Sequence, residues 1–248
     1  MLLSKVKSFY YHKLALSVGV PDCHFLMKKN NIFRLIDRNK IKFNSVLDIG
    51  CSNGLLSMIL LKRYKCISYI EGFDKRHKSI EYAKNIAKEI KITSNYYAKS
   101  IENATLKNKF DLILFIDSIQ YVSNKNLIFS KIKQHLKKCG HLILYVPPEE
   151  REYLVLPKFI LKKQPIYNWY YPTYEEIFHL INQNSFEVVC FYWVGGKFIR
   201  YYMAFKNWVR SYSKLSSYLF FPLDVIFAQI DRLPKKYGYG IFFLLKHK

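Results

Sequence analysis

Two acidic residues and two glycines follow short apolar runs near the N-terminal end of the chain, where they could bind a polar ligand. Asp48, Gly50, Ser52 and Gly54 lie in the stretch VLDIGCSNG, and Asp74 ends the apolar run SYIEGFD twenty residues after Gly54. Glycine lets a ligand approach the backbone closely and adopts dihedral angles closed to other residues. Carboxylates accept hydrogen bonds from hydroxyl and amino groups. The spacing therefore predicts a ligand site built from two successive strand ends.

The elements that would position these residues alternate between short apolar runs and helical patterns, which favours a parallel α/β sheet. The expected strands cover residues 45–50, 68–74, 95–98, 110–117, 141–146, 186–193 and 240–245. The expected helices cover 55–64, a segment with apolar positions from Ile80 to Ile90, a segment capped by Ser123 and stopped at Gly140, and 173–184. Ligands of such sheets bind at the carboxyl ends of the strands, where strand order reverses.

Two classes of cofactor compete for the turn after the first strand. A dinucleotide site requires G-x-G-x-x-G, and the third glycine of that pattern would fall at Leu55. Asp48 would also place a carboxylate beside an anionic pyrophosphate. A nicotinamide dinucleotide is therefore disfavoured, and a ligand that carries an amino acid and a positive charge fits better.

The same residues resemble the class I, Rossmann-like, S-adenosylmethionine-dependent methyltransferases, of the methyltransferase type 11/12 kind. VLDIGCSNG is similar to the family's D/E-x-G-x-G-x-G turn, with Ser52 in place of the middle glycine. Asp74 matches the acid that accepts hydrogen bonds from both ribose hydroxyls. FDLILFIDSIQYV, HLKKCGHLILYVP and YYPTYEEIFHLINQNSFEVV resemble the family's fourth strand, its step into the fifth, and its helix and sixth strand. The resemblance covers residues 45–195 in the family's order.

The resemblance implies a seven-stranded, mostly parallel sheet in the order 3-2-1-4-5-7-6, with the seventh strand antiparallel and helices on both faces. It implies S-adenosyl-L-methionine as cofactor and S-adenosyl-L-homocysteine as product. The implied cofactor contacts are Asp48, Gly50, Cys51, Ser52, Gly54, Asp74, Lys75, Ser100, Ile101, Ile116 and Asp117. Ser100 stands where relatives often have an acid that holds the adenine amino group, so Glu102 is a candidate substitute. Tyr121 stands where many relatives have a histidine.

Methyl transfer to a hydroxyl group benefits from a general base at the carboxyl edge of the sheet. The candidates are Asp117 and Tyr121 after the fourth strand, Glu149 after the fifth, and His24 in the N-terminal extension; Gln120, Glu150 and Arg151 belong to the same edge. His141 would lie at the opposite edge, His135 and His179 would be solvated, and His77 would serve the cofactor. The sequence does not decide among the candidates, and it shows no metal-binding spacing.

Composition limits the partners and the compartment. The chain has 248 residues, 40 basic against 18 acidic side chains, and a formal net charge of +22, which favours an anionic partner unless the excess of lysine is a compositional bias. Five scattered cysteines without a C-x-x-C pair favour a reducing compartment. No apolar run reaches the ~18 residues of a membrane-spanning helix, and the N-terminus lacks a signal-peptide pattern. We expect a cytoplasmic protein, with peripheral association at the inner face of a membrane as an open alternative.

The expected organisation is a helical extension or lid at residues 1–40 and a methyltransferase domain at 41–248, with a helical insertion at 197–236. In that insertion Phe205 and Trp208 mark an apolar face, and Lys206, Arg210 and Lys214 a basic one. The insertion is either a lid or a surface that rests on an anionic membrane. We expect O-methylation of a small molecule, a glycan or a lipid-linked intermediate. RNA methylation is the less favoured alternative, because the fourth strand lacks D/N-P-P-Y and a cysteine nucleophile, and a non-catalytic cofactor-binding subunit is the third.

Overall fold

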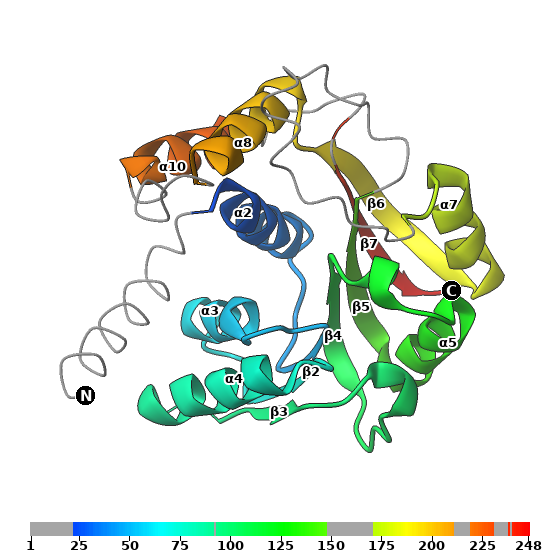
Figure 1. Cartoon of the computed structure of the whole chain (residues 1–248). Helices are drawn as coiled ribbons and strands as arrows, with labels where there is room; N and C mark the ends of the chain where they lie inside the picture. The colour runs from blue at the N-terminus through cyan, green and yellow to red at the C-terminus, as the bar shows by residue number, and fades with distance from the viewer. Residues whose placement is uncertain (1–21, 92, 148–170, 211–218, 231–237, 239) are drawn as a thin grey trace.

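The computed structural model describes residues 22–91, 93–147, 171–210, 219–230, 238 and 240–248. Within these ranges one sheet has seven strands in the order β3-β2-β1-β4-β5-β7-β6 (Figure 1). Strands β1 to β5 run parallel, and β7 is antiparallel to both β5 and β6. The strands are β1 (Ser45–Ile49), β2 (Tyr69–Phe73), β3 (Asn95–Tyr97), β4 (Phe110–Ile116), β5 (Leu136–Val146), β6 (Phe186–Val194) and β7 (Gly240–His247). The expected strand order and the antiparallel seventh strand are confirmed.

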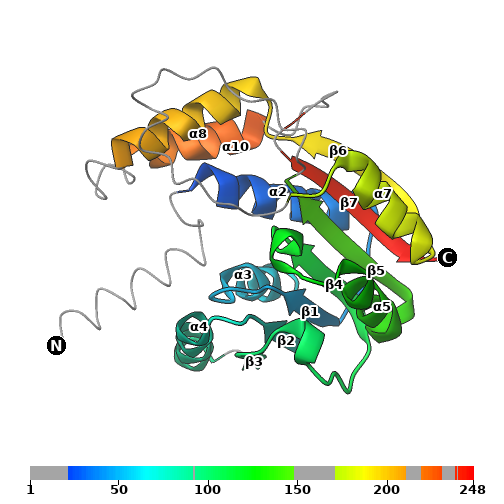
Figure 2. The same cartoon turned by 45° about the vertical axis from the view of Figure 1, so that its right-hand side comes forward.

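Helices cover both faces of this sheet (Figures 1 and 2). They are α2 (Cys23–Arg38), α3 (Leu55–Arg63), α4 (His77–Glu89), α5 (Lys125–His135), α7 (Tyr174–Gln183), α8 (Lys197–Arg210) and α10 (Phe221–Ile230). Side chains of α5 and α7 share one buried cluster with one face of β4, and side chains of α2, α3 and α10 share another with the opposite face. The central strands are apolar on both faces because both faces are covered.

The end of α5 differs from the expectation. We expected Leu136 to lie inside the helix and Gly140 to stop it, but α5 ends at His135 and β5 begins at Leu136. Leu136 pairs with Phe110 of β4, and the register shifts between Phe110 and Leu112. Strand pairing therefore overrides the helical periodicity in this segment.

The start of α5 differs as well. The side chain of Asn124, one residue after the expected Ser123, accepts a hydrogen bond from the backbone N–H of Leu127 at 2.9 Å and caps the helix. Ser123 instead donates to Glu102 through its hydroxyl at 2.8 Å and its backbone N–H at 3.1 Å. Ser123 therefore ties this turn to the segment that follows β3.

Helices α8 and α10 lie side by side, outside α2 (Figures 1 and 2). Asp224 of α10 is buried, forms an ion pair with Lys206 of α8, and accepts a hydrogen bond from the Tyr202 hydroxyl at 2.7 Å. The expected basic face of the insertion is therefore wrong at Lys206, which is buried. Phe205, on the expected apolar face, is 44% exposed.

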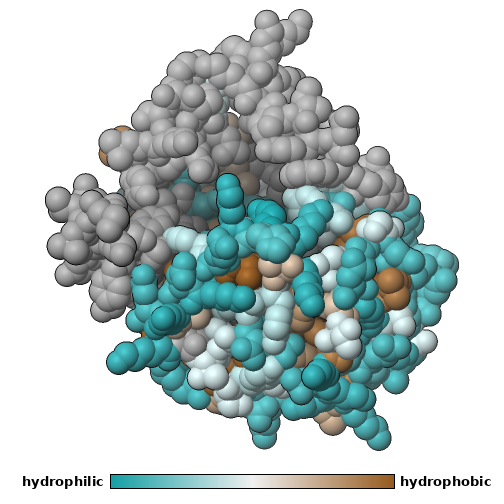
Figure 3. All heavy atoms as spheres, turned by 60° about the horizontal axis from the view of Figure 1, so that its bottom comes forward, coloured by the Kyte–Doolittle hydropathy of each residue, from teal (hydrophilic) through white to brown (hydrophobic). Residues whose placement is uncertain are grey.

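The face at the bottom of Figure 1 carries mostly hydrophilic residues, and its hydrophobic ones form small separate patches (Figure 3). Among the residues that the structure describes, no helix is long and apolar enough to cross a membrane. Of the expected extension at residues 1–40, the structure describes only the part from Asp22, whose side chain caps α2 by accepting from the N–H groups of His24 and Phe25.

Candidate active site

A cavity of about 550 Å³ opens at the carboxyl ends of β1, β2 and β4. This volume lies within the usual range of small-molecule sites. Its lining contains Lys28, Ile49, Gly50, Ser52, Phe73, Asp74, Lys75, Arg76, Lys99, Ser100, Ile101, Glu102, Phe115, Ile116, Asp117, Ser118, Tyr121 and Val122. Most of the expected cofactor residues are thus brought together at the cavity. Asp48, Cys51 and Gly54 are not among its lining residues. The expectation that these three contact the cofactor directly has no support in the lining.

The turn from β1 into α3 forms the floor of the cavity, and its backbone requires residues that tolerate a positive φ. Gly50, Ser52 and Gly54 have φ angles of 74°, 53° and 68°. A Cβ atom at Gly50 would lie 2.1 Å from the Ser118 hydroxyl oxygen, and one at Gly54 would lie 2.7 Å from the ring of Tyr96. Both glycines are therefore needed by the packing of the turn itself. Gly50 also brings backbone to the cavity.

Asp48 carries a carboxyl group in the interior of the sheet, opposite Gly72 of β2 and Leu114 of β4. It is almost fully buried, and its Oδ2 atom has no hydrogen-bond partner. Burial raises the pKa of Asp48 to about 7; a hydrogen bond from Ser57 opposes the rise, and the charge of Asp74 adds to it. An unsatisfied buried acceptor is costly for the fold alone.

Asp74 follows the end of β2 and turns its carboxylate to the cavity floor. It accepts hydrogen bonds at 2.9 Å from the backbone N–H groups of Ser52 and Arg76, and its partner Arg76 also donates through Nε at 3.1 Å. Burial works to raise the pKa of Asp74, but the hydrogen bonds from Arg76 and Ser52 hold it below its usual value. The Arg76 side chain is 61% exposed, so a ligand hydroxyl can displace its guanidinium at little cost.

The end of the cavity expected to hold adenine contains Ser100, Ile101 and Glu102. Ile101 is buried and offers an apolar surface. Both carboxylate oxygens of Glu102 are engaged, Oε2 by the Ser100 hydroxyl at 3.0 Å and Oε1 by Ser123 and the Asn124 backbone N–H. Glu102 therefore holds the neighbouring turn in place, and its use as a substitute adenine ligand would require it to give up these contacts.

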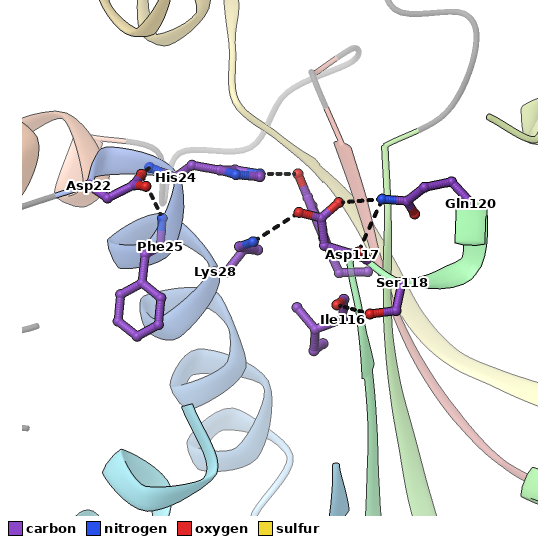
Figure 4. A network of polar contacts seen from close by, with 9 residues as sticks. Asp22, His24, Phe25, Lys28, Ile116, Asp117, Ser118 and Gln120 are labelled. Carbon is purple, nitrogen blue, oxygen red and sulfur yellow. Dashed lines mark hydrogen bonds and ion pairs between the residues drawn. The ribbon is translucent and has the colours of Figure 1, made fainter. Parts of the chain in front are cut away.

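Helix α2 supplies the opposite wall (Figure 4). Lys28 projects from α2 to Asp117 at the end of β4, with 3.0 Å between Nζ and Oδ2, and Gln120 donates to the other oxygen of Asp117 at 3.1 Å. One helical turn earlier, Nε2 of His24 lies 3.0 Å from the hydroxyl of Tyr145 in β5. Burial acts to raise the pKa of Asp117, but the charges of Lys28 and His24 outweigh it and lower the pKa to about 2.

These contacts separate the four candidate bases. Asp117, with a pKa of about 2, is a permanent negative charge near neutral pH and a weak proton acceptor. Burial and the charge of Asp117 raise the pKa of Tyr121, so that its hydroxyl stays protonated. Glu149 lies outside the described residues, as do Glu150 and Arg151. Among the described candidates His24 remains, although it is not one of the residues that line the cavity.

The sequence analysis did not identify Lys28 or Tyr145 as residues of the site. Lys28 follows His24 by four residues, so both lie on one face of a helix. That spacing was a usable signal, although nothing in the sequence shows that this helix covers the cavity. Tyr145 sits within an apolar strand, where its hydroxyl has no recognisable sequence signature.

The residues present fit S-adenosylmethionine. Asp74 offers a carboxylate held by backbone N–H groups, Gly50 leaves backbone accessible at the floor, and Ile101 offers an apolar surface. Together with the 3-2-1-4-5-7-6 sheet, this carboxyl-edge cavity is the arrangement of a class I, Rossmann-like methyltransferase. Within the described residues, no group of three or more His, Cys, Asp or Glu side chains is arranged to hold a metal ion.

Comparison with known proteins agrees with this class. Residues 42–206 match the family model described as a methyltransferase domain. The chain is 25% identical over 170 residues to a putative methyltransferase, 235L, of Invertebrate iridescent virus 6, and the match covers 67% of this chain and 60% of that protein. It is 32% identical over 121 residues to the ubiquinone biosynthesis O-methyltransferase of Pelagibacter ubique, covering 48% of this chain and 49% of that protein. The matches thus span about half to three fifths of these relatives.

Solved structures share the fold. An S-adenosylmethionine-dependent methyltransferase from Clostridium acetobutylicum superposes with a TM-score of 0.61 at 15% identity, covering 100% of this chain and 99% of that one. The O-methyltransferase of a trans-AT PKS multienzyme from Brevibacillus brevis, in complex with S-adenosyl-L-homocysteine, gives a TM-score of 0.59 at 17% identity, covering 88% and 71%. Since the family model matches more than half of the chain, the chain belongs to the methyltransferase-domain family.

Proposed function

We propose that this methyltransferase methylates an oxygen atom of a small molecule, a sugar or a lipid-linked acceptor, with His24 as general base. The observation that carries the proposal is the position of α2, whose His24 and Lys28 side chains reach the ends of β5 and β4 beside the cavity. The ubiquinone biosynthesis relatives, named as O-methyltransferases, support the choice of oxygen. Because the matches cover only part of those relatives, their acceptor is not carried over.

The cofactor end of the cavity is assigned to four residues. Asp74 accepts hydrogen bonds from the ribose hydroxyls after Arg76 moves aside, Gly50 and Ser52 present backbone to the amino-acid part, and Ile101 packs against the adenine. S-adenosylmethionine supplies an electrophilic methyl group on a sulfonium sulfur. The remaining work of the protein is to align the acceptor oxygen with that methyl group and to exclude water.

His24 takes the proton that the acceptor hydroxyl loses. Nε2 of His24 lies 3.0 Å from the Tyr145 hydroxyl, and the imidazole of His24 takes up the proton from the acceptor. Tyr145 is fully buried and fixes the orientation of the ring. The Asp117 carboxylate is close enough to act on His24 electrostatically and stabilises the imidazolium form once the proton has arrived. Lys28 keeps that carboxylate ionised and in place.

The substrate class is tested by methyl labelling. Purified protein and radiolabelled S-adenosylmethionine are added to a host extract fractionated into RNA, lipid, glycan, protein and small molecules, with Asp74→Ala as the control. We expect label in the lipid, glycan or small-molecule fraction with the wild type only. Label confined to RNA or protein would contradict the proposed acceptor class.

The role of His24 is tested with the acceptor found in that way. His24→Gln should lower kcat by about 10² to 10⁴, the usual contribution of a general base, and should abolish the acidic limb of the pH–rate profile while leaving cofactor affinity unchanged. Tyr145→Phe should lower kcat less, because the ring of His24 remains available. His179→Gln, on α7, is the matched control and should behave as the wild type. Wild-type kcat in His24→Gln would exclude His24 as the base.

A further inference from the structure

Helix α10 presents a row of apolar side chains to the outside of the molecule. Leu219, Leu223, Ile226 and Ile230 are 80%, 42%, 51% and 50% exposed. Leu223, Ile226 and Ile230 recur at three- and four-residue spacing on one face of α10, and Leu219 lies two residues before the helix begins. Phe205 of α8, 44% exposed, extends this face, since its ring lies 6.0 Å from the ring of Phe220. We call Leu219, Leu223, Ile226, Ile230 and Phe205 the α10 face.

The opposite side of α10 packs against the molecule, where Phe221 and Phe227 are partly buried in apolar clusters. Asp224 and Ala228 are buried, Asp224 in its ion pair with Lys206 and Ala228 against α2, where its carbonyl oxygen accepts from Asn30 Nδ2 at 3.4 Å. The only charged side chain of α10 therefore points inward. A helix fixed by a buried ion pair, with leucine and isoleucine turned out, has an apolar face suited to a non-aqueous partner.

The charges around α10 in the sequence favour an anionic partner. Lys214 precedes the helix, and Arg232, Lys235 and Lys236 follow it, against one acid, Asp231. Apolar side chains bordered by lysine and arginine are typical of helices that lie in the interface of an anionic bilayer.

We propose that the α10 face docks on an anionic membrane surface. Ten residues of helix span about 15 Å, half of what crossing a bilayer requires, so α10 would lie in the plane of the interface with its apolar side chains among the acyl chains. Helix α2, which α10 contacts, carries Lys28 to the cavity and His24 to Tyr145 at the end of β5. Docking would thus bring the acceptor end of the cavity close to the membrane, which, resting on the proposed function, favours a lipid-linked acceptor.

The test is co-sedimentation of the full chain with vesicles, either of phosphatidylcholine alone or of phosphatidylcholine with phosphatidylglycerol. We expect binding to the anionic vesicles that weakens with salt. Leu223→Glu with Ile226→Glu should reduce the apparent affinity at least tenfold. Leu127→Glu, a matched change at an exposed leucine of α5, should leave it unchanged. Lys235→Gln with Lys236→Gln should reduce it on the order of fivefold per residue, through the electrostatic part alone.

Three outcomes would overturn the proposal: no binding of the wild type to anionic vesicles, equal loss of binding in Leu127→Glu and the double variant, or a wild-type dimer that the double variant dissolves without any vesicle binding. The last would make the α10 face an interface between two copies. Circular dichroism and S-adenosylmethionine affinity establish that each variant is folded. Vesicle binding is measured without cofactor or acceptor. A negative vesicle result would therefore not contradict the proposed methyl transfer, and a negative labelling result would not contradict membrane docking.

Discussion

Among the aspartates near the cavity, Asp48 has a raised pKa, because its surroundings in the folded protein disfavour a negative charge. Its carboxyl group is buried between neighbouring strands, one oxygen lacks a hydrogen-bond partner, and the carboxylate of Asp74 lies near enough to repel it. Asp74 and Asp117 differ, because backbone N–H groups, Arg76 or Lys28 hold their negative charges. Of these three aspartates, Asp74 and Asp117 are therefore charged near neutral pH, whereas the pKa of Asp48 is about 7.

This difference gives a prediction for Asp48→Asn. The pKa of Asp48 is raised in the folded state, to about 7 from 3.8 in the unfolded chain, so the folded state holds the proton over that interval and wild-type stability falls as pH rises from about 4 to 7. The Asp48→Asn variant has no carboxyl group at this position, so its stability does not fall over that pH interval for this reason. Without cofactor, its free energy of unfolding should exceed that of the wild type at pH 8 by up to roughly 4 kcal/mol and approach it near pH 4.

Urea unfolding at pH 5 and pH 8 measures the effect of Asp48→Asn. Glu187→Gln, which removes an exposed carboxylate from β6, is the control and should show no such dependence on pH. A variant less stable than the wild type at pH 8 would contradict the account of Asp48, and would mean that its carboxylate is stabilised in the folded protein.

At the residue scale, the sequence predicted the acids and glycines at strand ends but not their neighbours. Asp74 and Gly50 stand at positions that a motif defines, so both were found. Lys28 was missed, because its role depends on how a separate helix is placed over the sheet. The proposed use of Glu102 was drawn from its place in the chain, whereas its carboxylate is bound to Ser123, a contact between residues 21 positions apart.

At the scale of elements, a buried ion pair joins α8 and α10. Lys206 and Asp224 have side chains exposed by only 8% and 0%. Removing one member of such a pair leaves an unpaired buried charge and costs about 3–5 kcal/mol, whereas replacing both with apolar residues is often neutral. The pair explains why a lysine in an apparently basic stripe does not contribute to the surface.

Asp224→Asn should therefore destabilise the protein by about 3–5 kcal/mol, and Asp224→Leu combined with Lys206→Met should recover most of that loss. Urea unfolding of the single and double variants measures both. If the double variant lost as much stability as the single one, the ion pair would not be the contact that matters, and the hydroxyl of Tyr202 would be the next to examine.

The elements also show where sequence periodicity stops being informative. The helix before β5 was expected to continue to Gly140, because Ile128, Ile132 and Leu136 recur at four-residue spacing. The chain instead pairs Leu136 with Phe110 of β4. The same residue satisfies a helical pattern and a strand pattern, and only the position of β4 decides between them.

For the whole molecule, the strand order was predictable and the outer layer was not. The strand-end motifs carry the resemblance to the class I methyltransferases, and that resemblance implied the strand order that the sheet shows. The placement of α2, α8 and α10 follows from contacts among helices that carry no motif, such as Asn30 with Ala228. Of these helices α2 lines the cavity, through Lys28, and no sequence motif marked that contact.

The net charge of +22 is also a property of the whole molecule. At the cavity, Lys28, Lys75, Arg76 and Lys99 line a site whose cofactor is itself cationic. Lys28 and Arg76 are held by Asp117 and Asp74. The basic character of the cavity therefore does not by itself imply an anionic acceptor.

The measurement that tests the account most directly is the affinity for S-adenosylmethionine, by titration calorimetry, of the wild type, Asp74→Ala and Glu187→Gln. The account predicts that Asp74→Ala weakens binding at least tenfold, because the ribose loses its carboxylate partner at the end of β2. It predicts that Glu187→Gln binds as the wild type does. Wild-type affinity in a folded Asp74→Ala variant would contradict it, and would place the cofactor somewhere other than the cavity between β1, β2 and β4.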